Sequence, residues 1–183
     1  FKPNFAEAHN NLGNLLQHQE NLVAAREHYE EALHLKPEFA EAHCNLGTVF
    51  KAEGNLEAAV KHYEQALSHS PNLSNAHNNL GTVFQEQGQL ARALQHYERA
   101  LLLNPKDADI HNNLSTAFRI QGNLVAALKE CEQALLLKPA APHIHYHQSY
   151  ILLMMGNFAQ AWREYLWRPG RRVYYTKMQR TPL

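Results

Sequence analysis

The chain has 183 residues, enough for one ordinary domain or one short repeat array. Its 17 lysines and arginines are matched by 17 acidic residues, so it lacks the basic excess of a general nucleic-acid-binding protein. The longest apolar run, Ile151–Met155, is far too short for a membrane span, and two cysteines imply no disulfide framework. These features predict a protein without nucleic-acid or membrane partners, and they fit a cytoplasmic location.

A period of 34 residues runs through most of the chain. Successive prolines lie one period apart, and so do the Asn-Leu-Gly segments that begin at Asn11, Asn45 and Asn79. Such strict spacing predicts an array of structural repeats. The chain begins within this pattern, so we expect the end of a preceding repeat at 1–5, followed by full units at 6–39, 40–73, 74–107 and 108–141 and a divergent unit at 142–168.

Each period predicts two helices joined by a short turn. In the unit 40–73, apolar residues recur at helical spacing from residue 40 to about 53 and again from 56 to 68. Gly54 permits the left-handed backbone that ends a helix, and Asn55 is a good N-cap for the next helix. One helix pair cannot bury its apolar face alone, so stacked pairs and an all-α fold are expected.

Small residues recur where the two helices of a pair should approach closely. Gly47 and Ala59 keep the backbones free to approach, and Tyr63 fills the space beside them. Cys131 occupies the position of the repeat tyrosines, so we interpret it as a core substitution and not as a reactive thiol.

These residues carry a family resemblance. A 34-residue helix–turn–helix unit with Leu-Gly, an aromatic residue, and then Ala, Tyr, Ala and Pro resembles the tetratricopeptide repeat. In the divergent unit, Gln148-Ser149 replaces Leu-Gly and Arg168 replaces an alanine. The resemblance implies a right-handed α-solenoid of stacked helix–turn–helix hairpins, without a cofactor or an enzymatic role of its own. It also implies a scaffold whose partner is a protein or an extended peptide.

The resemblance places the second, fifth, sixth, ninth and twelfth residues of each unit in an inner groove. One column there is uniform in asparagine, and an amide offers a donor and an acceptor to the backbone of an extended peptide. Alternatively, the asparagines bond to the neighbouring repeat, or are neutral residues copied by duplication. The peptide-binding candidates are Asn11, Asn45, Asn79, Asn113, Asn10, Asn14, Asn78, Asn112, Thr48, Thr82 and Thr116.

Two further resemblances suggest a larger context. The asparagine column is similar to the inner-groove asparagines of protein O-GlcNAc transferase, and residues 162–169 look like the segment that closes the repeats in bacterial proteins with a following glycosyltransferase domain. They imply a substrate-docking region of a glycosyltransferase. The alternative is a self-association module that stacks through its terminal repeats. Residues 169–183 are interpreted as a basic, aromatic tail or linker.

Histidines suggest a metal site only weakly. The column His9, His43, His77, His111 and His145 recurs once per repeat and is interpreted as packing residues. His143 and His147 are four residues apart and could share one ion, but two ligands fall short of the four of a structural zinc site. We therefore assign no metal ligand and no catalytic residue, and the role of the group His143, His145 and His147 stays open.

Overall fold

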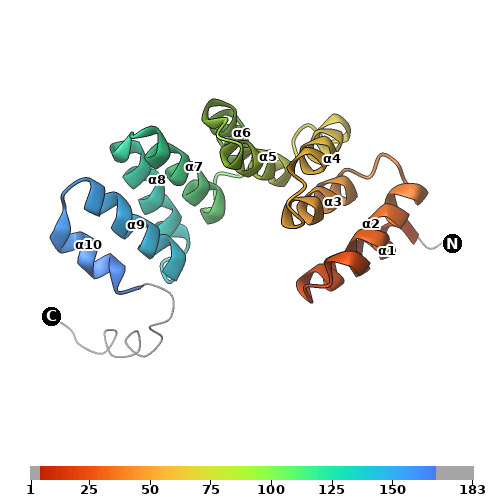
Figure 1. The fold of residues 1–183 in the computed structure, drawn as a ribbon, viewed down its shortest axis with the longest axis horizontal. Coiled ribbons are helices and arrows are strands. Elements are labelled where there is room, and N and C mark those ends of the chain that lie inside the picture. The colour runs from red at the N-terminus through yellow and green to blue at the C-terminus, as the bar shows by residue number, and fades with distance from the viewer. Residues whose placement is uncertain (1–4, 168–183) are drawn as a thin grey trace. The chain divides into compact units, whose positions relative to one another are not determined.

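The computed structural model describes residues 5–167, and this range contains ten α-helices and no strand (Figure 1). The predicted tail at 169–183 and residues 1–4 lie outside the described residues. In chain order the helices are α1 (Phe5–His18), α2 (Leu22–Leu35), α3 (Ala40–Ala52), α4 (Leu56–His69), α5 (Ser74–Glu86), α6 (Leu90–Leu103), α7 (Ala108–Gln121), α8 (Leu124–Leu137), α9 (Pro142–Met154) and α10 (Phe158–Tyr165).

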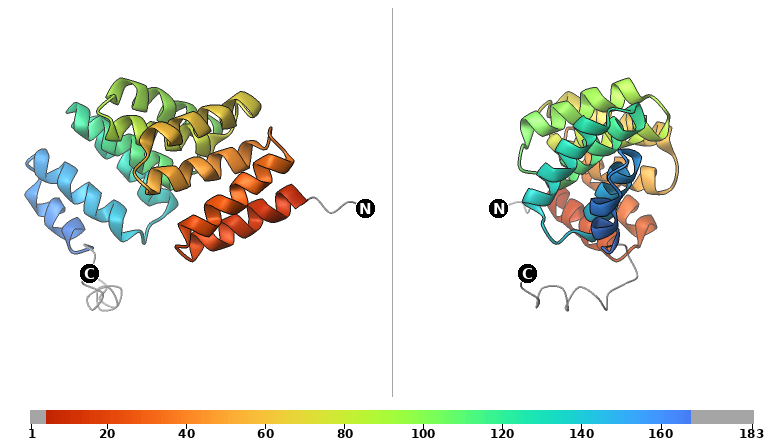
Figure 2. Two further views of the ribbon diagram at one scale, coloured as in Figure 1. Left: turned by 45° about the vertical axis from the view of Figure 1, so that its right-hand side comes forward. Right: turned by 90° about the vertical axis from the view of Figure 1, so that its left-hand side faces the viewer.

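The helices form pairs, and the pairs are grouped into two compact units. The first unit, Phe1–Leu103, contains α1 to α6, and the second, Asn104–Leu183, contains α7 to α10. In the first unit each pair contacts the next through α2 and α3 and through α4 and α5 (Figure 2). In the second unit α8 packs on α9. The prediction of an all-α fold of stacked helix pairs is confirmed. None of the helices between residues 5 and 167 is long and apolar enough to cross a membrane.

The turn inside each pair has the backbone that the sequence predicts. Gly54 has a φ of 79°, which glycine adopts without a Cβ clash, and the Asn55 side chain accepts a hydrogen bond from the Ala58 N–H at 3.1 Å. Glycines occupy the same position in the later pairs, but the first pair has Glu20 there, with a φ of 61°. All five turns therefore have the same left-handed backbone. In the first pair a glutamate adopts it in place of a glycine.

Each pair stacks on the next through the apolar face of its first helix. Leu46 and Val49 of α3 are 2% and 0% exposed, and they form one cluster with Ala25 and Tyr29 of α2. In the second unit Ile144 and Ile151 of α9 form a similar cluster with residues of α8. The core is therefore a series of interfaces between successive pairs, as expected for repeats that cannot bury an apolar face alone.

The tyrosine of the second helix fills the space that a glycine of the first helix leaves open. A Cβ on Gly47 would lie 2.8 Å from Cε1 of Tyr63 and 3.2 Å from the backbone oxygen of Ala59. The sequence suggested that the glycine allows the two helix backbones to approach. The structure shows that it mainly leaves space for the tyrosine ring. Ser115 and Cys131 replace the two residues in the fourth pair. With the smaller Cys131 opposite, the Ser115 Oγ donates to the Ala127 carbonyl at 2.6 Å.

We expect Gly47→Ala to destabilise the protein by about 1–2 kcal/mol, because overpacking outweighs the roughly 1 kcal/mol that alanine gains over glycine in a helix. Urea unfolding followed by circular dichroism measures the change. In a double-mutant cycle of Gly47→Ser with Tyr63→Cys, which copies the fourth pair, the serine should cost less beside cysteine than beside tyrosine, by about 1 kcal/mol. Additive effects of the two substitutions would contradict this account.

Candidate functional site

The asparagine column bonds across the interface between successive pairs. Asn45 Nδ2 of α3 donates to Oδ1 of Asn10 and Oδ1 of Asn14 on α1, both at 2.9 Å. Asn79 Nδ2 of α5 donates to Thr48 Oγ1 on α3 at 3.3 Å, and the Cys44 sulfur lies 3.9 Å away. The amide N–H groups of both columnar residues are therefore engaged within the first unit.

The acceptors in turn bond to the buried tyrosines. The Tyr29 hydroxyl lies 2.8 Å from Asn14 Oδ1 and 2.8 Å from Gln17 Oε1, and it donates its proton to one of them at a time. The Tyr63 hydroxyl donates to Thr48 Oγ1 at 3.2 Å, and Thr48 donates to the Cys44 carbonyl at 3.1 Å. We call these tyrosine, ninth-residue and asparagine side chains the polar layer. It links the second helix, the first helix and the next pair.

The third pair repeats part of this layer. The Tyr97 hydroxyl donates to Thr82 Oγ1 at 3.4 Å, and Thr82 donates to the Asn78 carbonyl at 3.1 Å. Burial raises the pKa of Tyr29 and Tyr97 to about 12, so both hydroxyls stay protonated and can donate. The layer is therefore held by neutral hydrogen bonds, which do not depend on pH near neutrality.

In the fifth helix pair a histidine takes the place of the columnar asparagine. His147 lies 34 residues after Asn113, and its Nδ1 lies 3.0 Å from Asn112 Oδ1. Its Nε2 accepts from Arg119 Nε at 3.3 Å and lies 3.4 Å from Thr116 Oγ1. Burial, then Arg119 and His143, lowers the His147 pKa to about 4, which fits a neutral ring that donates from Nδ1.

This geometry bears on the metal hypothesis for His143 and His147. Both ring nitrogens of His147 face protein partners, and His143 Nε2 lies 4.0 Å from Asp109. Among the described residues no three His, Cys, Asp or Glu side chains gather as metal ligands would. The 34-residue spacing was the signal that could have identified His147 as a member of the column.

The columnar asparagines differ in their exposure and in the atoms that remain available to a ligand. Asn11 on α1 is exposed, whereas Asn45, Asn79 and Asn113 are half-buried. Within residues 5–167 no donor reaches the Oδ1 of Asn45 or Asn79. The column can thus offer carbonyl oxygens to a bound chain, while its N–H groups hold the repeats together.

The histidine column forms a second set of contacts, inside each pair. His43 Nε2 donates to the Pro37 carbonyl at 2.9 Å, and its Nδ1 lies 3.2 Å from Nδ1 of His62 on the second helix. The corresponding Nδ1–Nδ1 distances are 2.9 Å for His9–His28 and 3.1 Å for His77–His96. A neutral pair satisfies these contacts when the second-helix ring donates from Nδ1 to the first.

In the second unit a glutamate replaces the second histidine of the pair. His111 Nδ1 lies 2.7 Å from Glu130 Oε2 while its Nε2 lies 3.2 Å from the Pro105 carbonyl, so both ring nitrogens face acceptors. His145 has the same arrangement with Glu164 and Pro139, and the Trp167 ring stacks on it at 4.1 Å between centroids. At His145 the two acceptors favour the doubly protonated imidazolium.

The pKa values of His62 and His96 are shifted in the opposite direction from that of His145. Burial, followed by a neighbouring histidine and a neighbouring basic residue, lowers the pKa of His62 and of His96 to about 4. Burial also lowers the pKa of His145, but its bonds to Glu164 and the Pro139 carbonyl outweigh this, so the His145 pKa is raised overall. The pairs that contain His62 and His96 are therefore acid-sensitive.

We expect the first unit to lose stability as the pH falls from about 6.5, the unfolded-state pKa of histidine, towards about 4. Stability is fully present above that window, because the folded-state pKa of His62 and His96 lies below the unfolded value and the unfolded chain binds more protons within it. Urea midpoints at about pH 7 and about pH 5 measure the loss.

His62→Glu copies the His111–Glu130 pair and should reduce this loss, since a carboxylate stabilises the protonated His43. Glu130→His is the matched reverse change, and it should make the second unit more acid-sensitive. An equal acid loss in His62→Glu and in the unaltered chain would show that the histidine pair does not control the response.

Comparisons with known proteins agree with the helix-pair architecture. Two sequence models of the tetratricopeptide repeat match, one over residues 4–72 and 38–104 and the other over residues 78–143. No curated protein sequence matches the chain.

Many solved structures are similar to this fold. PilF of Pseudomonas aeruginosa gives a TM-score of 0.81 at 24% identity, covering 88% of this chain and 74% of PilF. TTC0263 of Thermus thermophilus, a thermophilic tetratricopeptide repeat protein, gives 0.76 at 21% identity, covering 91% and 93%. YrrB, described as a tetratricopeptide repeat protein with an unusual peptide-binding site, gives 0.69 at 23% identity, covering 93% and 90%. The period, the helix pairs and the matched sequence models together show that the chain belongs to the tetratricopeptide repeat family.

Proposed function

We propose that the chain is a scaffold for protein–protein interaction, and that the first helices within each unit bind an extended segment of a partner protein. The observation that carries the proposal is the asparagine column, whose carbonyl oxygens accept no hydrogen bond within the described residues at Asn45 and Asn79. A row of acceptors at the repeat spacing suits the backbone N–H groups of an extended peptide. The solvent-exposed amide of Asn11 extends the row in α1.

A narrower form of the proposal makes the chain the substrate-docking region of a larger glycosyltransferase. It rests on the resemblance of the asparagine column and of residues 162–169 to segments of such proteins. A substrate-docking region should bind many unrelated sequences, because acceptors that contact backbone N–H groups do not distinguish side chains. Broad binding therefore favours this form over a scaffold with one partner.

The test is a peptide array probed with the purified chain, with Asn45→Ala/Asn79→Ala and with Asn11→Ala. The double variant should lose binding and also about 1–3 kcal/mol of stability, because it removes hydrogen bonds of the polar layer. Asn11→Ala should weaken binding with a stability change below about 0.5 kcal/mol, since Asn11 is exposed.

Gly47→Ala is the matched control, because it destabilises the first unit through the Tyr63 contact and leaves the amides in place. If it retains binding while the double asparagine variant loses it, the amides contact the ligand. If all variants lose binding in proportion to stability, the column is structural only and the proposal is wrong.

The second candidate is self-association, favoured by the exposed apolar face of α1. Leu12 and Leu15 are 41% and 55% exposed, whereas Leu46 and Val49 at the same repeat positions are 2% and 0% exposed because α2 covers them. A second helix from another copy could cover Leu12 and Leu15 in the same way. This face lies outside the asparagine column, so the two candidates can be separated.

For the second candidate we expect the molar mass from light scattering to rise with protein concentration. Leu12→Glu/Leu15→Glu should abolish the rise, because burying two carboxylates in this interface is unfavourable. The asparagine variants should leave it unchanged. A constant monomer mass for the unaltered chain across the concentration range would exclude self-association through this face.

A further inference from the structure

An amide occupies a buried apolar position at the interface between α8 and α9. Gln148 is the counterpart of Leu46, Leu80 and Leu114, which are 2%, 1% and 3% exposed, and Gln148 itself is 9% exposed. No residue in the described part of the chain forms a hydrogen bond with its side chain. The amide atoms of Gln148 are not among the fully buried polar atoms that lack a partner, so the amide reaches solvent at a position where the second to fourth pairs bury a leucine.

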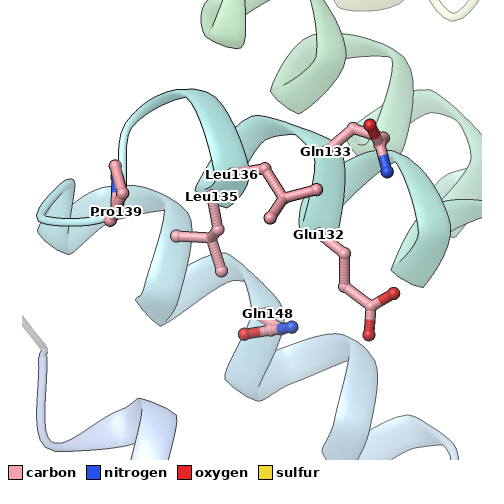
Figure 3. Close-up of a pocket in the computed structure, with 6 residues that line it drawn as sticks. All are labelled: Glu132, Gln133, Leu135, Leu136, Pro139 and Gln148. Carbon is pink, nitrogen blue, oxygen red and sulfur yellow. The ribbon is translucent and has the colours of Figure 1, made fainter.

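The Gln148 amide faces a cavity of about 510 Å³ that α8 lines from the other side (Figure 3). Leu135, Leu136 and Pro139 form its apolar wall, and Glu132 and Gln133 add polar groups. Figure 3 shows the Glu132 carboxylate and the Gln148 amide below Leu135 and Leu136, with the amide nitrogen turned toward Glu132 and the amide oxygen turned away. Glu132 forms no ion pair with any residue between 5 and 167.

We propose that this cavity binds a lysine or arginine side chain of a partner protein. The aliphatic stem of such a side chain packs on Leu135, Leu136 and Pro139, as such stems do on apolar surfaces. Its cationic group pairs with the Glu132 carboxylate, and a half-turn of the Gln148 amide brings Oε1 to the same side as a second acceptor. The negative charge of Glu132 and the Gln148 amide oxygen, which accepts no hydrogen bond from a described residue, select a cation over a purely apolar side chain.

The first unit contains a natural control for this site. The positions that correspond to the cavity between α8 and α9 lie on α4, the turn after it and α5, one interface of the same kind. Four of the six residues are identical, and the other two are Leu80 in place of Gln148 and Ser68 in place of Leu136. At these six positions the second unit therefore differs from the first by one amide and one larger apolar side chain.

The site also differs from the proposed groove. Its residues come from α8, from the turn that follows it and from one face of α9, and none of them belongs to the asparagine column or the polar layer. Loss of peptide binding in the asparagine variants therefore does not test this cavity. The groove proposal and the cavity proposal can each be wrong without the other.

The experiment is an NMR titration of the full isotope-labelled chain with Nα-acetyl-lysine methylamide, followed at the Gln148 side-chain amide and the Leu135 and Leu136 methyl groups. We expect saturable shifts, with Nα-acetyl-norleucine methylamide binding at least about threefold more weakly because it lacks the charge. Glu132→Gln should remove this preference for lysine. The absence of saturable shifts up to the solubility limit, or equal binding of both probes, would overturn the proposal.

Gln148→Leu should weaken lysine binding at least about tenfold, since it removes the amide that accepts from the ammonium group. It should also raise the urea midpoint, because a leucine is buried at this position in the second to fourth pairs. Ser68→Leu/Leu80→Gln should create a second lysine site in the first unit, with shifts at the side-chain amide introduced on α5. Unchanged lysine binding by Gln148→Leu would show that the amide has no part in recognition. Failure of the double variant, while still folded by circular dichroism, to bind lysine would show that these two residues do not define the site.

Discussion

The contact between a second-helix tyrosine and a first-helix glycine is the interaction on which each repeat of the first unit depends. Tyr29, Tyr63 and Tyr97 are at most 1% exposed, and each ring occupies the space that a Cβ on the facing glycine would need. The ring closes the helix pair, and the hydroxyl then reaches the ninth residue of the first helix. One side chain therefore holds the apolar core of a pair and begins the polar layer.

The polar layer shows which atoms of the columnar asparagines hold the repeats together and which remain for the proposed peptide contact. The columnar amides bond through their N–H groups to the preceding pair, and their carbonyl oxygens remain for a ligand at Asn45 and Asn79. Because Asn45 and Asn79 are fixed by intramolecular bonds, a peptide bound as we propose would meet side chains that are already oriented, and less conformational entropy would be lost on binding. The same arrangement makes these residues hard to vary, since a change that alters recognition also alters the contact between repeats.

The 34-residue period and local turn chemistry were enough to predict the helix pairs. Around Gly54 and Asn55, the helix ends at Ala52 and the next begins at Leu56, within one residue of the prediction. The site was less predictable, because an amide column fits a ligand and a neighbouring repeat equally well on sequence grounds, and only distances show the Asn45 bonds. The partner of His43 was missed because His62, 19 residues later, belongs to a different helix. The resemblance to glycosyltransferase-associated repeats remains a prediction, and residues 169–183 lie outside the described chain.

The left-handed backbone at Glu20 affects which helix pair of the first unit unfolds locally. A residue with a side chain pays about 1–2 kcal/mol for a left-handed backbone, and the other four turns avoid this cost with glycine. In a linear array each pair is stabilised by its own energy and by its neighbours, so the pair with the weakest turn unfolds locally most often. The α1–α2 hairpin would then open while α3 to α6 stay folded. Such local unfolding would expose the apolar face of Leu46 and Val49 while the remaining pairs stay folded. We therefore expect the α1–α2 hairpin to unfold and refold as a separate cooperative element of the first unit.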